Sequence, residues 1–261
     1  MKSRIVISIL IILACLCPIG ALASGCDTLR IRVMTYNLRL GELATLEQLA
    51  EHIIAFNPDF VALQEVDVHT MRRLAPHQNG KDFIGELAYH TGMFGFYGKT
   101  IPYRGGYEGI AMLSKYPAIK VEKIMLPNPQ NTEPRALLAG VFEMGEDTIS
   151  FNGTHLDVVS RETRKIQAEW ITEHLSHVPY PTVIAGDFNA RHYTEAITDV
   201  MNVKWFPATD SAFTFPAKAP FLKLDYIYAR PIEKWRLIST QAIQSTLSDH
   251  LPIISILEYI K

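Results

Sequence analysis

Six short groups of polar residues, all built from Asn, Asp, Glu and His, each follow an apolar run of the chain. In order they are Asn37, Glu65, His155, Asp187 with Asn189, Asp225, and Asp249 with His250. Any one of these groups alone is compatible with an ordinary turn at the end of a strand. Oxygen side chains can hold a hard metal ion, however, and histidine transfers protons near neutral pH. Together the groups therefore predict a site for metal-assisted hydrolysis.

The order of these motifs resembles that of the endonuclease/exonuclease/phosphatase superfamily. This superfamily includes pancreatic-type deoxyribonucleases, exonuclease III-like repair enzymes, neutral sphingomyelinases and inositol-polyphosphate 5-phosphatases. Four motifs carry the resemblance: Gln-Glu at 64–65, Thr-His-Leu at 154–156, Gly-Asp-Phe-Asn at 186–189 and Ser-Asp-His at 248–250. It extends from about residue 30 to the last strand near residue 260. The resemblance implies cleavage of phosphoester bonds and a four-layer α/β sandwich of two mixed β-sheets flanked by helices.

The resemblance also implies a metal site. It assigns Glu65 as the anchoring carboxylate and Asn37 as a neutral oxygen donor, and it leaves Asp249 facing the metal or a water. A single Glu at a strand end is more often a solvated charge, but Glu65 directly follows the apolar run 60–63. The ligands are oxygen atoms, and no Cys or His cluster suits zinc, so the expected ion is Mg²⁺ or Mn²⁺.

Proton transfer is expected from His250, because imidazole titrates near neutral pH. The resemblance supplies Asp225 as the carboxylate that orients this ring. Asp187 would orient or deprotonate the attacking water, and Asn189 would hold a phosphate oxygen. On an extended segment the side chains of Asp187 and Asn189 face the same side. The alternative is an Asx-turn, which Gly-Asp-Phe-Asn can form unaided.

His155 is expected to donate a hydrogen bond to the phosphate. Asp157 lies on the same face of the expected strand and is a candidate partner for the ring of His155. Arg135, in Glu-Pro-Arg, either faces the substrate or forms a salt bridge. The other histidines are expected to be packed or solvated.

Short apolar runs and capping signals predict a mixed α/β chain. Thr45 and Gln48 have the form of a helix capping box, and apolar residues follow at helical spacing. Further helices are expected over 82–90 and after Ser160. We expect strands at 31–36, 60–63, 109–114, 137–142, 148–154, 182–185, 225–229 and 252–257. Periodicity alone thus predicts mixed sheets, and the four-layer arrangement follows from the resemblance.

The composition is that of a globular chain. The sequence has 261 residues, 48% of them hydrophobic, and it contains no internal repeat or Pro/Gly/Ser-rich linker. We therefore expect one catalytic domain, over residues 26–261. We also expect an export signal over residues 1–25 that is removed by cleavage. The basic residues Lys2 and Arg4 precede a short apolar run and a stretch of small residues, which is typical of such a signal.

The cysteines are compatible with two different N-termini of the mature chain. Cys15 and Cys17 lie in the apolar run, so only Cys26 remains in the mature chain. The preceding Leu-Ala-Ser-Gly resembles a bacterial lipoprotein cleavage box, which would make Cys26 a lipidated membrane tether. Ordinary cleavage after Ala23 would instead leave a periplasmic or secreted protein with an incidental thiol.

The formal net charge of −2 and the lack of a basic patch weaken the case for tight nucleic-acid binding. A lipid headgroup or a small molecule is therefore the favoured phosphoester substrate, and a secreted metal-dependent nuclease is the alternative. A non-catalytic surface binding protein is the minor alternative, and the completeness of the motifs counts against it. We expect a monomer.

An aromatic segment lies between Asn202 and Leu222, directly before Asp225. Its large rings are Trp205, Phe206, Phe213, Phe215 and Phe221. They either pack against the edge of a sheet or form an apolar lip that contacts a lipid tail or a base.

Overall fold

The computed structural model describes residues 28–261 of the chain. Its strands are β1 Thr28–Asn37, β2 Phe60–Val68, β3 Phe94–Tyr103, β4 Gly106–Ser114, β5 Ala118–Met125, β6 Ala136–Met144, β7 Asp147–His155, β8 Thr182–Asp187, β9 Phe206–Pro207, β10 Asp225–Arg230, β11 Trp235–Ala242 and β12 Ile253–Ile260. Its main helices are α1 Leu46–Ala55, α2 Phe83–Thr91, α3 Arg161–Ser176, a π-helix Ala196–Met201 and the short α4 Asn202–Lys204.

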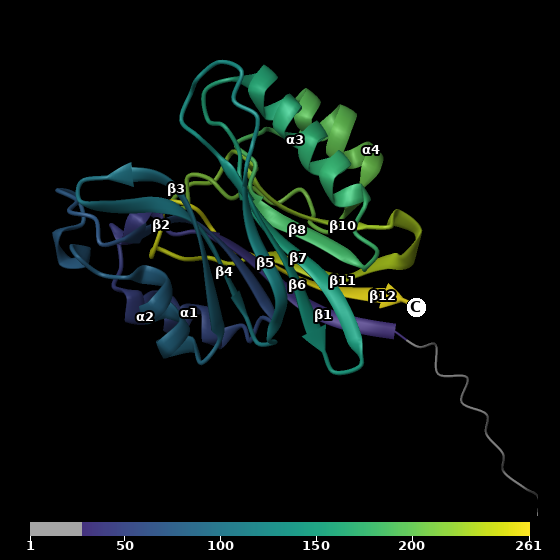
Figure 1. Cartoon of the computed structure of the whole chain (residues 1–261), viewed down its shortest axis with the longest axis horizontal. Coiled ribbons are helices and arrows are strands. Elements are labelled where there is room, and N and C mark those ends of the chain that lie inside the picture. The colour runs from purple at the N-terminus through teal and green to yellow at the C-terminus, as the bar shows by residue number, and fades with distance from the viewer. Residues whose placement is uncertain (1–27) are drawn as a thin grey trace, which may run out of the picture.

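The described strands form two six-stranded sheets. The strand order is β11-β12-β1-β2-β4-β3 in the first sheet and β5-β6-β7-β8-β10-β9 in the second. Each sheet is mixed, because it contains one parallel pair, β1 with β2 or β7 with β8, among antiparallel neighbours. Figure 1 shows the sheets at the centre of the molecule, with α1 and α2 on one side and α3 and α4 on the other.

Three apolar clusters separate the layers. The alternation of a strand sends Ile31 and Val33 of β1 between the two sheets, where they belong to one cluster with Phe151 and Val183 of the second sheet. Met34 of β1 faces the opposite way and clusters with α1 and α2. Residues of α3 and of the π-helix cover the outer face of the second sheet. The predicted four-layer sandwich is therefore confirmed.

The helix starts follow the predicted capping signals. Thr45 and Gln48 form the reciprocal capping box at the start of α1. The side chain of Asp82 accepts a hydrogen bond from the backbone N–H of Gly85 at the start of α2, and Ser160 caps α3 in the same way. These caps satisfy backbone N–H groups that a helix start leaves without partners.

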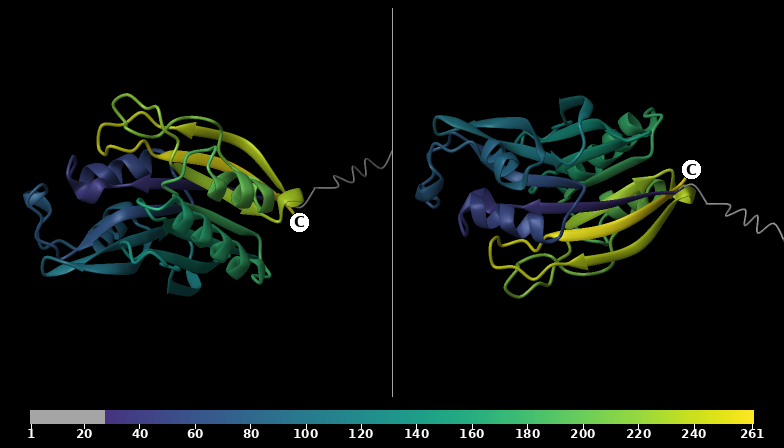
Figure 2. Two further views of the ribbon diagram at one scale, coloured as in Figure 1. Left: turned by 90° about the horizontal axis from the view of Figure 1, so that it is seen from above. Right: turned by 90° about the horizontal axis from the view of Figure 1, so that it is seen from below.

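The predicted export signal and Cys26 lie outside the described residues. Within residues 28–261, no helix has the length and apolar character needed to cross a membrane. The C-terminal strand β12 pairs antiparallel with β1, so the C-terminus lies beside the start of β1 (Figure 2).

Candidate active site

The predicted site residues lie at the ends of neighbouring strands. Asn37 is the last residue of β1, and His155 and Asp187 end the parallel strands β7 and β8. Asp225 begins β10, and the registers pair Asp187 with both His155 and Asp225. Sheet pairing alone therefore places three of the predicted catalytic residues side by side.

Glu65 reaches this site because β2 is irregular there. The pairing of β2 with β4 shifts between Leu63 and Val66, and Glu65 has a φ of 55°. A bulge of this kind changes the direction in which a side chain points. The amide nitrogen of Asn37 donates to Glu65 Oε1 at 3.0 Å and to Asp187 Oδ2 at 3.2 Å. Asn37 thus links the carboxylates of the two sheets.

The carboxylate of Asp187 is buried, and that of Glu65 is half-buried. Burial raises the pKa of Glu65 to about 7, and the hydrogen bond from Asn37 opposes this shift. Burial also raises the pKa of Asp187 to about 6, and the nearby charge of Asp225 adds to the shift. Both carboxylates would gain from a nearby cation, because their charged forms are poorly solvated.

His250 is one cation of the site. Its Nδ1 lies 2.9 Å from Asp225 Oδ2, and its Nε2 lies 3.8 Å from Asp187 Oδ2. Burial lowers the pKa of His250, but the charges of Asp225 and Asp187 outweigh burial and raise it to about 10. At neutral pH the ring is therefore an imidazolium whose Nδ1–H donates to Asp225.

His155 approaches the same carboxylate from β7, and its Nε2 lies 3.5 Å from Asp187 Oδ2. Its Nδ1 lies 3.1 Å from a guanidinium nitrogen of Arg135, the residue before β6. Burial, followed by the positive charges of Arg135 and His250, lowers the pKa of His155 well below its ordinary value. At neutral pH this ring is uncharged.

Asp157 does not pair with His155, so that part of the prediction is wrong. Its carboxylate accepts hydrogen bonds from the hydroxyl of Thr132 and from the backbone N–H groups of Val159 and Ser160. The strand ends at His155, and the following residues turn into the loop before α3. Asp157 therefore stabilises this loop instead of continuing the face of the strand.

The segment 186–189 adopts the turn that was the alternative to an extended conformation. The carboxylate of Asp187 accepts a hydrogen bond from the backbone N–H of Asn189 at 2.8 Å, and Asn189 has a φ of 48°. The expectation that both side chains share one face of an extended segment is therefore wrong. The side-chain amide of Asn189 donates to the carbonyl of Leu156 at 3.0 Å and so lies next to the end of β7.

Asp249 lies at the wall of an adjoining cavity of about 800 Å³. Its carboxylate accepts a hydrogen bond from Arg39 at 2.6 Å, and Arg39 also binds Glu42 at 2.7 Å. The neighbouring Ser248 donates its hydroxyl to the carbonyl of Asn37 at 2.7 Å, which fixes this loop to the end of β1. Asp249 is therefore close to the other predicted residues, and it shares the positive charge of Arg39 with Glu42.

The model of the Endonuclease/Exonuclease/phosphatase family matches residues 34–250, which is most of the chain. The chain belongs to this family. Its members are hydrolases that act on phosphoester bonds.

The chain also has relatives in sequence and in structure. The uncharacterized protein YbhP of Escherichia coli (strain K12) is 27% identical over 252 residues, covering 85% of this chain and 94% of that protein. The endonuclease/exonuclease/phosphatase of Beutenbergia cavernae superimposes with a TM-score of 0.73 at 19% identity, over 88% of this chain and 72% of that one. The Bacteroides thetaiotaomicron mannosyl-6-phosphatase Bt3783 superimposes with a TM-score of 0.70 at 15% identity, over 87% of this chain and 99% of that one. At such identities the structural likeness shows the shared fold.

The donors at this endonuclease/exonuclease/phosphatase site fit a hard divalent cation. Glu65 presents carboxylate oxygens, the amide oxygen of Asn37 also accepts a hydrogen bond from the backbone N–H of Arg39 at 3.0 Å, and Asp249 lies on the adjoining wall. Such oxygen ligands suit Mg²⁺, which keeps several waters and needs few protein ligands. Asp187, Asp225 and His250 also have ligand atoms within 4.8 Å of one another. In that group the Nδ1–H of His250 is bound to Asp225, so we assign the group to proton transfer.

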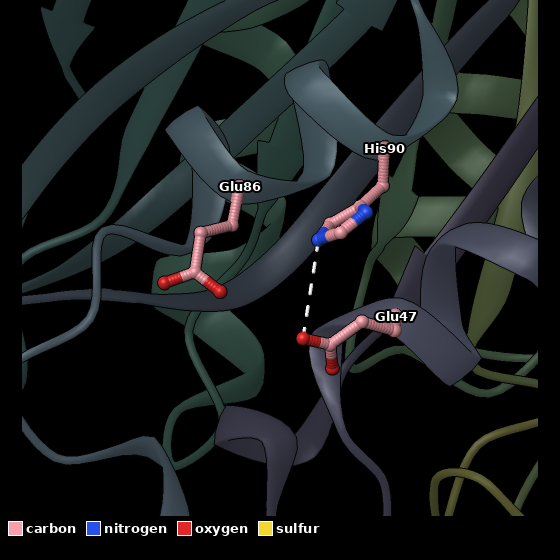
Figure 3. A group of neighbouring side chains, drawn as sticks. All are labelled: Glu47, Glu86 and His90. Atoms are coloured by element: carbon pink, nitrogen blue, oxygen red, sulfur yellow. Dashed lines mark ion pairs between the residues drawn. The ribbon is translucent and has the colours of Figure 1, made fainter.

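A second group of ligand-type side chains lies on the outer surface, between α1 and α2. It consists of Glu47, Glu86 and His90 (Figure 3). His90 Nε2 is 3.9 Å from Glu47 Oε1, and the ammonium of Lys81 is 3.8 Å from Glu86 Oε2. Each side chain is at least one-third exposed, and Lys81 already balances part of the negative charge. We interpret this group as a solvated ion-pair surface.

Sequence reasoning did not find Arg39. Its partner Asp249 lies 210 residues away along the chain, and no local motif connects the two. For Arg135 the sequence left open a role at the substrate or in a salt bridge. The guanidinium contacts both Glu133 at 3.1 Å and His155 at 3.1 Å.

The aromatic segment divides into a core part and a surface part. Trp205 is fully buried, and its indole N–H donates to Thr172 of α3 at 3.0 Å. Phe213 and Phe221 are 44% and 62% exposed and line a pocket of about 230 Å³. Between them, the ring of Phe215 packs at 4.8 Å from the ring of His250. Packing therefore explains Trp205, and the exposed rings lie on the loop that contacts the site.

Proposed function

We propose that this protein is a divalent-metal-dependent phosphoester hydrolase in which Asp187 activates the attacking water. The observation that carries the proposal is the placement of one buried oxygen between three proton donors. Asp187 Oδ2 lies 3.2 Å from the amide nitrogen of Asn37, 3.5 Å from His155 Nε2 and 3.8 Å from His250 Nε2. A phosphate group bound beside this oxygen would be near the same donors.

Asn37 and Glu65, with Asp249 at the adjoining wall, are the residues that would hold Mg²⁺ or Mn²⁺. The cation, when bound, would neutralise negative charge on the phosphate and on the leaving oxygen. The donor set supports this assignment, since it is built from oxygens and includes a half-buried carboxylate with a raised pKa.

The remaining chemistry is assigned to side chains of this chain. Burial makes Asp187 a stronger base than an ordinary carboxylate, yet its pKa of about 6 leaves it ionised at neutral pH. It orients the water and accepts its proton. His250 is a cation that donates from Nε2, and Asp225 fixes the orientation of its ring. His155 donates to a phosphate oxygen, and Asn189 supports a second oxygen.

A lipid headgroup or a small phosphorylated molecule is the favoured substrate. The exposed rings of Phe213 and Phe221 lie on the loop whose Phe215 contacts His250, and exposed aromatic rings suit an apolar or planar group. The formal net charge of −2 gives no long-range attraction for a nucleic-acid backbone. The likeness to a mannosyl-6-phosphatase adds sugar phosphates to the candidates.

A substrate panel with and without Mg²⁺ tests this function. It contains sphingomyelin, phosphatidylinositol phosphates, mannose 6-phosphate, bis-p-nitrophenyl phosphate, RNA and plasmid DNA. We expect hydrolysis that EDTA abolishes and Mg²⁺ or Mn²⁺ restores, with lipid or small-molecule substrates ahead of nucleic acid. The Asp187→Ala variant, purified identically, controls for contaminating enzymes. Full activity in metal-stripped protein contradicts the metal requirement, and a preference for DNA or RNA identifies the nuclease alternative.

We also propose that the protein is exported and acts as a monomer, either soluble or tethered through Cys26. The basic start and the short apolar run of the N-terminus support export. Mass spectrometry of the mature N-terminus tests this. A chain starting at Ser24 indicates a soluble exported enzyme, and a diacylglyceryl Cys26 indicates a lipoprotein. A chain that still starts at Met1 contradicts both, and sedimentation analysis tests the monomer.

A further inference from the structure

Arg135 is one of the few charged residues buried in the described part of the chain, with 7% of its surface exposed. The register of β6 with β7 pairs Leu137 with Thr154, which places the residue before β6 next to the end of β7. There its Nη1 lies 3.1 Å from Nδ1 of His155, and its Nη2 lies 3.1 Å from Glu133. The guanidinium is thus held at both ends, with the imidazole at the inner one.

The direction of the inner hydrogen bond follows from the chemistry of its two partners. A guanidinium has five N–H donors and no acceptor, and it stays protonated in proteins. Nδ1 of His155 must therefore accept, and a nitrogen that accepts carries no proton. A neutral imidazole with an unprotonated Nδ1 carries its proton on Nε2, the atom that lies 3.5 Å from Asp187 Oδ2.

We propose that Arg135 is a positioning residue that fixes His155 as the tautomer protonated on Nε2, so that this N–H always points into the site. This part of the proposal concerns the free protein and requires no substrate. Its use in catalysis rests on the proposed function, where the Nε2–H of His155 donates to a phosphate oxygen beside Asp187.

The surroundings of His155 provide no competing partner for Nδ1 among the described residues. Asp157, the carboxylate predicted for this role, is occupied by Thr132 and by the loop before α3. Asp187 lies on the Nε2 side of the ring, and His250 is a cation that faces the same carboxylate. The carboxylate of Asp187 thus favours a proton on Nε2, and on the other side of the ring the donor that excludes a proton from Nδ1 is Arg135.

Nitrogen-15 NMR of the imidazole rings tests the tautomer directly, and the signal that disappears in a His155→Gln variant identifies His155. At neutral pH we expect one protonated nitrogen, Nε2, and one unprotonated nitrogen, Nδ1. In Arg135→Met, which keeps the length of the side chain but removes every donor, the two tautomers should mix or the ring should become protonated. Arg135→Lys, which keeps a charged donor, should recover much of the wild-type pattern.

Arg161→Met is the matched control, because Arg161 is an exposed arginine whose ion pair is with Glu195, on the surface. It should leave the nitrogen pattern of His155 unchanged. A wild-type proton on Nδ1 overturns the proposal, as does a folded Arg135→Met variant that keeps the wild-type pattern. If Arg135→Met does not fold, the wild-type protein and Arg135→Lys decide the question. A proton on Nε2 of His155 in both spectra supports the proposal, and its absence from the wild-type spectrum overturns it.

The catalytic consequence has a separate readout. On the best substrate of the panel, Arg135→Met should lower kcat by about tenfold to a hundredfold, the usual effect of removing a partner that orients a functional histidine. KM should change much less, and Arg135→Lys should restore part of kcat. If no phosphoester is cleaved but the nitrogen pattern is as expected, the proposed function fails and the assignment of the tautomer stands. An unchanged kcat in a folded Arg135→Met variant overturns the catalytic role.

Discussion

His155 and His250 approach the same oxygen of Asp187, at 3.5 Å and 3.8 Å, and each is 6% exposed. They differ in the residue behind the ring. A guanidinium lies behind His155 and a carboxylate lies behind His250. The pKa of His155 is lowered, chiefly by burial, whereas the charges of Asp225 and Asp187 raise that of His250 to about 10. Burial acts against the charged form of both rings, and only at His250 do neighbouring carboxylates outweigh it.

The two arrangements also have different structural origins. His155 and Arg135 lie at the adjacent ends of β7 and β6, within one sheet. Asp225 begins β10 of that sheet, whereas His250 comes from the loop before β12 of the other sheet. The Asp225–His250 pair therefore depends on how the two sheets pack, and the Arg135–His155 pair depends on pairing within one sheet.

The largest effect is expected from removing what both histidines share. Asp187→Ala should lower kcat by at least ~10²-fold, because it removes the base that we propose orients the water. His250→Ala should have an effect of similar order, because it removes the acid of the site. Both are measured as kcat on the best substrate, with circular dichroism as the control for folding. Near wild-type turnover in either variant would show that its assigned role is wrong.

Asp225→Asn changes only one side of the comparison. Without the charge of Asp225 the pKa of His250 should fall from about 10, because Asp225 is the largest of the groups that raise it. If catalysis needs protonated His250, the alkaline limb of the pH–rate profile should move to lower pH. At pH 8 kcat should fall by about tenfold or more. An unchanged profile would remove the pairing, and the nitrogen pattern of His155 should not change.

Metal removal should also change the stability of the fold, by an amount that is modest and depends on pH. Burial raises the pKa of Glu65 from 4.5 to about 7, so the folded metal-free protein binds more protons than the unfolded chain between these values. The stability linked to Glu65 is present below pH 4.5 and is lost as the pH rises through 7. Asp187, raised from 3.8 to about 6, acts in the same direction.

We therefore expect EDTA to lower the melting temperature by a few degrees at pH 8 and by less at pH 5.5, because the proposed Mg²⁺ would bind the ionised carboxylates. Calorimetry at the two pH values, with and without Mg²⁺, measures this difference. Glu65→Gln is the control, and it should reduce both the pH dependence and the response to Mg²⁺. An equal response to EDTA at both pH values would exclude Glu65 as a ligand.

The sequence predicted the central strands and the site better than the edges of the sheets. Strands β2 and β8 contain short apolar runs because both of their faces are covered, and in β1 and β7 apolar residues alternate with polar ones over part of the strand. The edge strands β3, β5 and β11 were not predicted, and much of each is exposed. An edge strand needs no apolar run, so it leaves a weak signal.

The same reasoning explains the outcome at the site. The residues at strand ends were found because motif and strand coincide, as at Asp187 and Asp225. The partners that set charge could not be read from the sequence, because Arg39 meets Asp249 only through packing between distant segments. The φ of 55° at Glu65 was also missed, since a bulge depends on the pairing with β4.

The smallest effect on catalysis is expected at the exposed rings of Phe213 and Phe221. They lie on the loop that packs on His250, but among the described residues the ring of this loop that contacts His250 is that of Phe215. If they form a lip, Phe213→Ala and Phe221→Ala should raise KM several-fold for a substrate with an apolar tail. Hydrolysis of bis-p-nitrophenyl phosphate, the pH–rate profile and the melting temperature should not change.

Trp205→Ala is the contrasting variant, because removing this buried ring should cost roughly 3–5 kcal/mol of folding free energy and lower all activities alike. Equal KM values for wild type and both Phe variants on every substrate would show that the loop serves only to pack against His250.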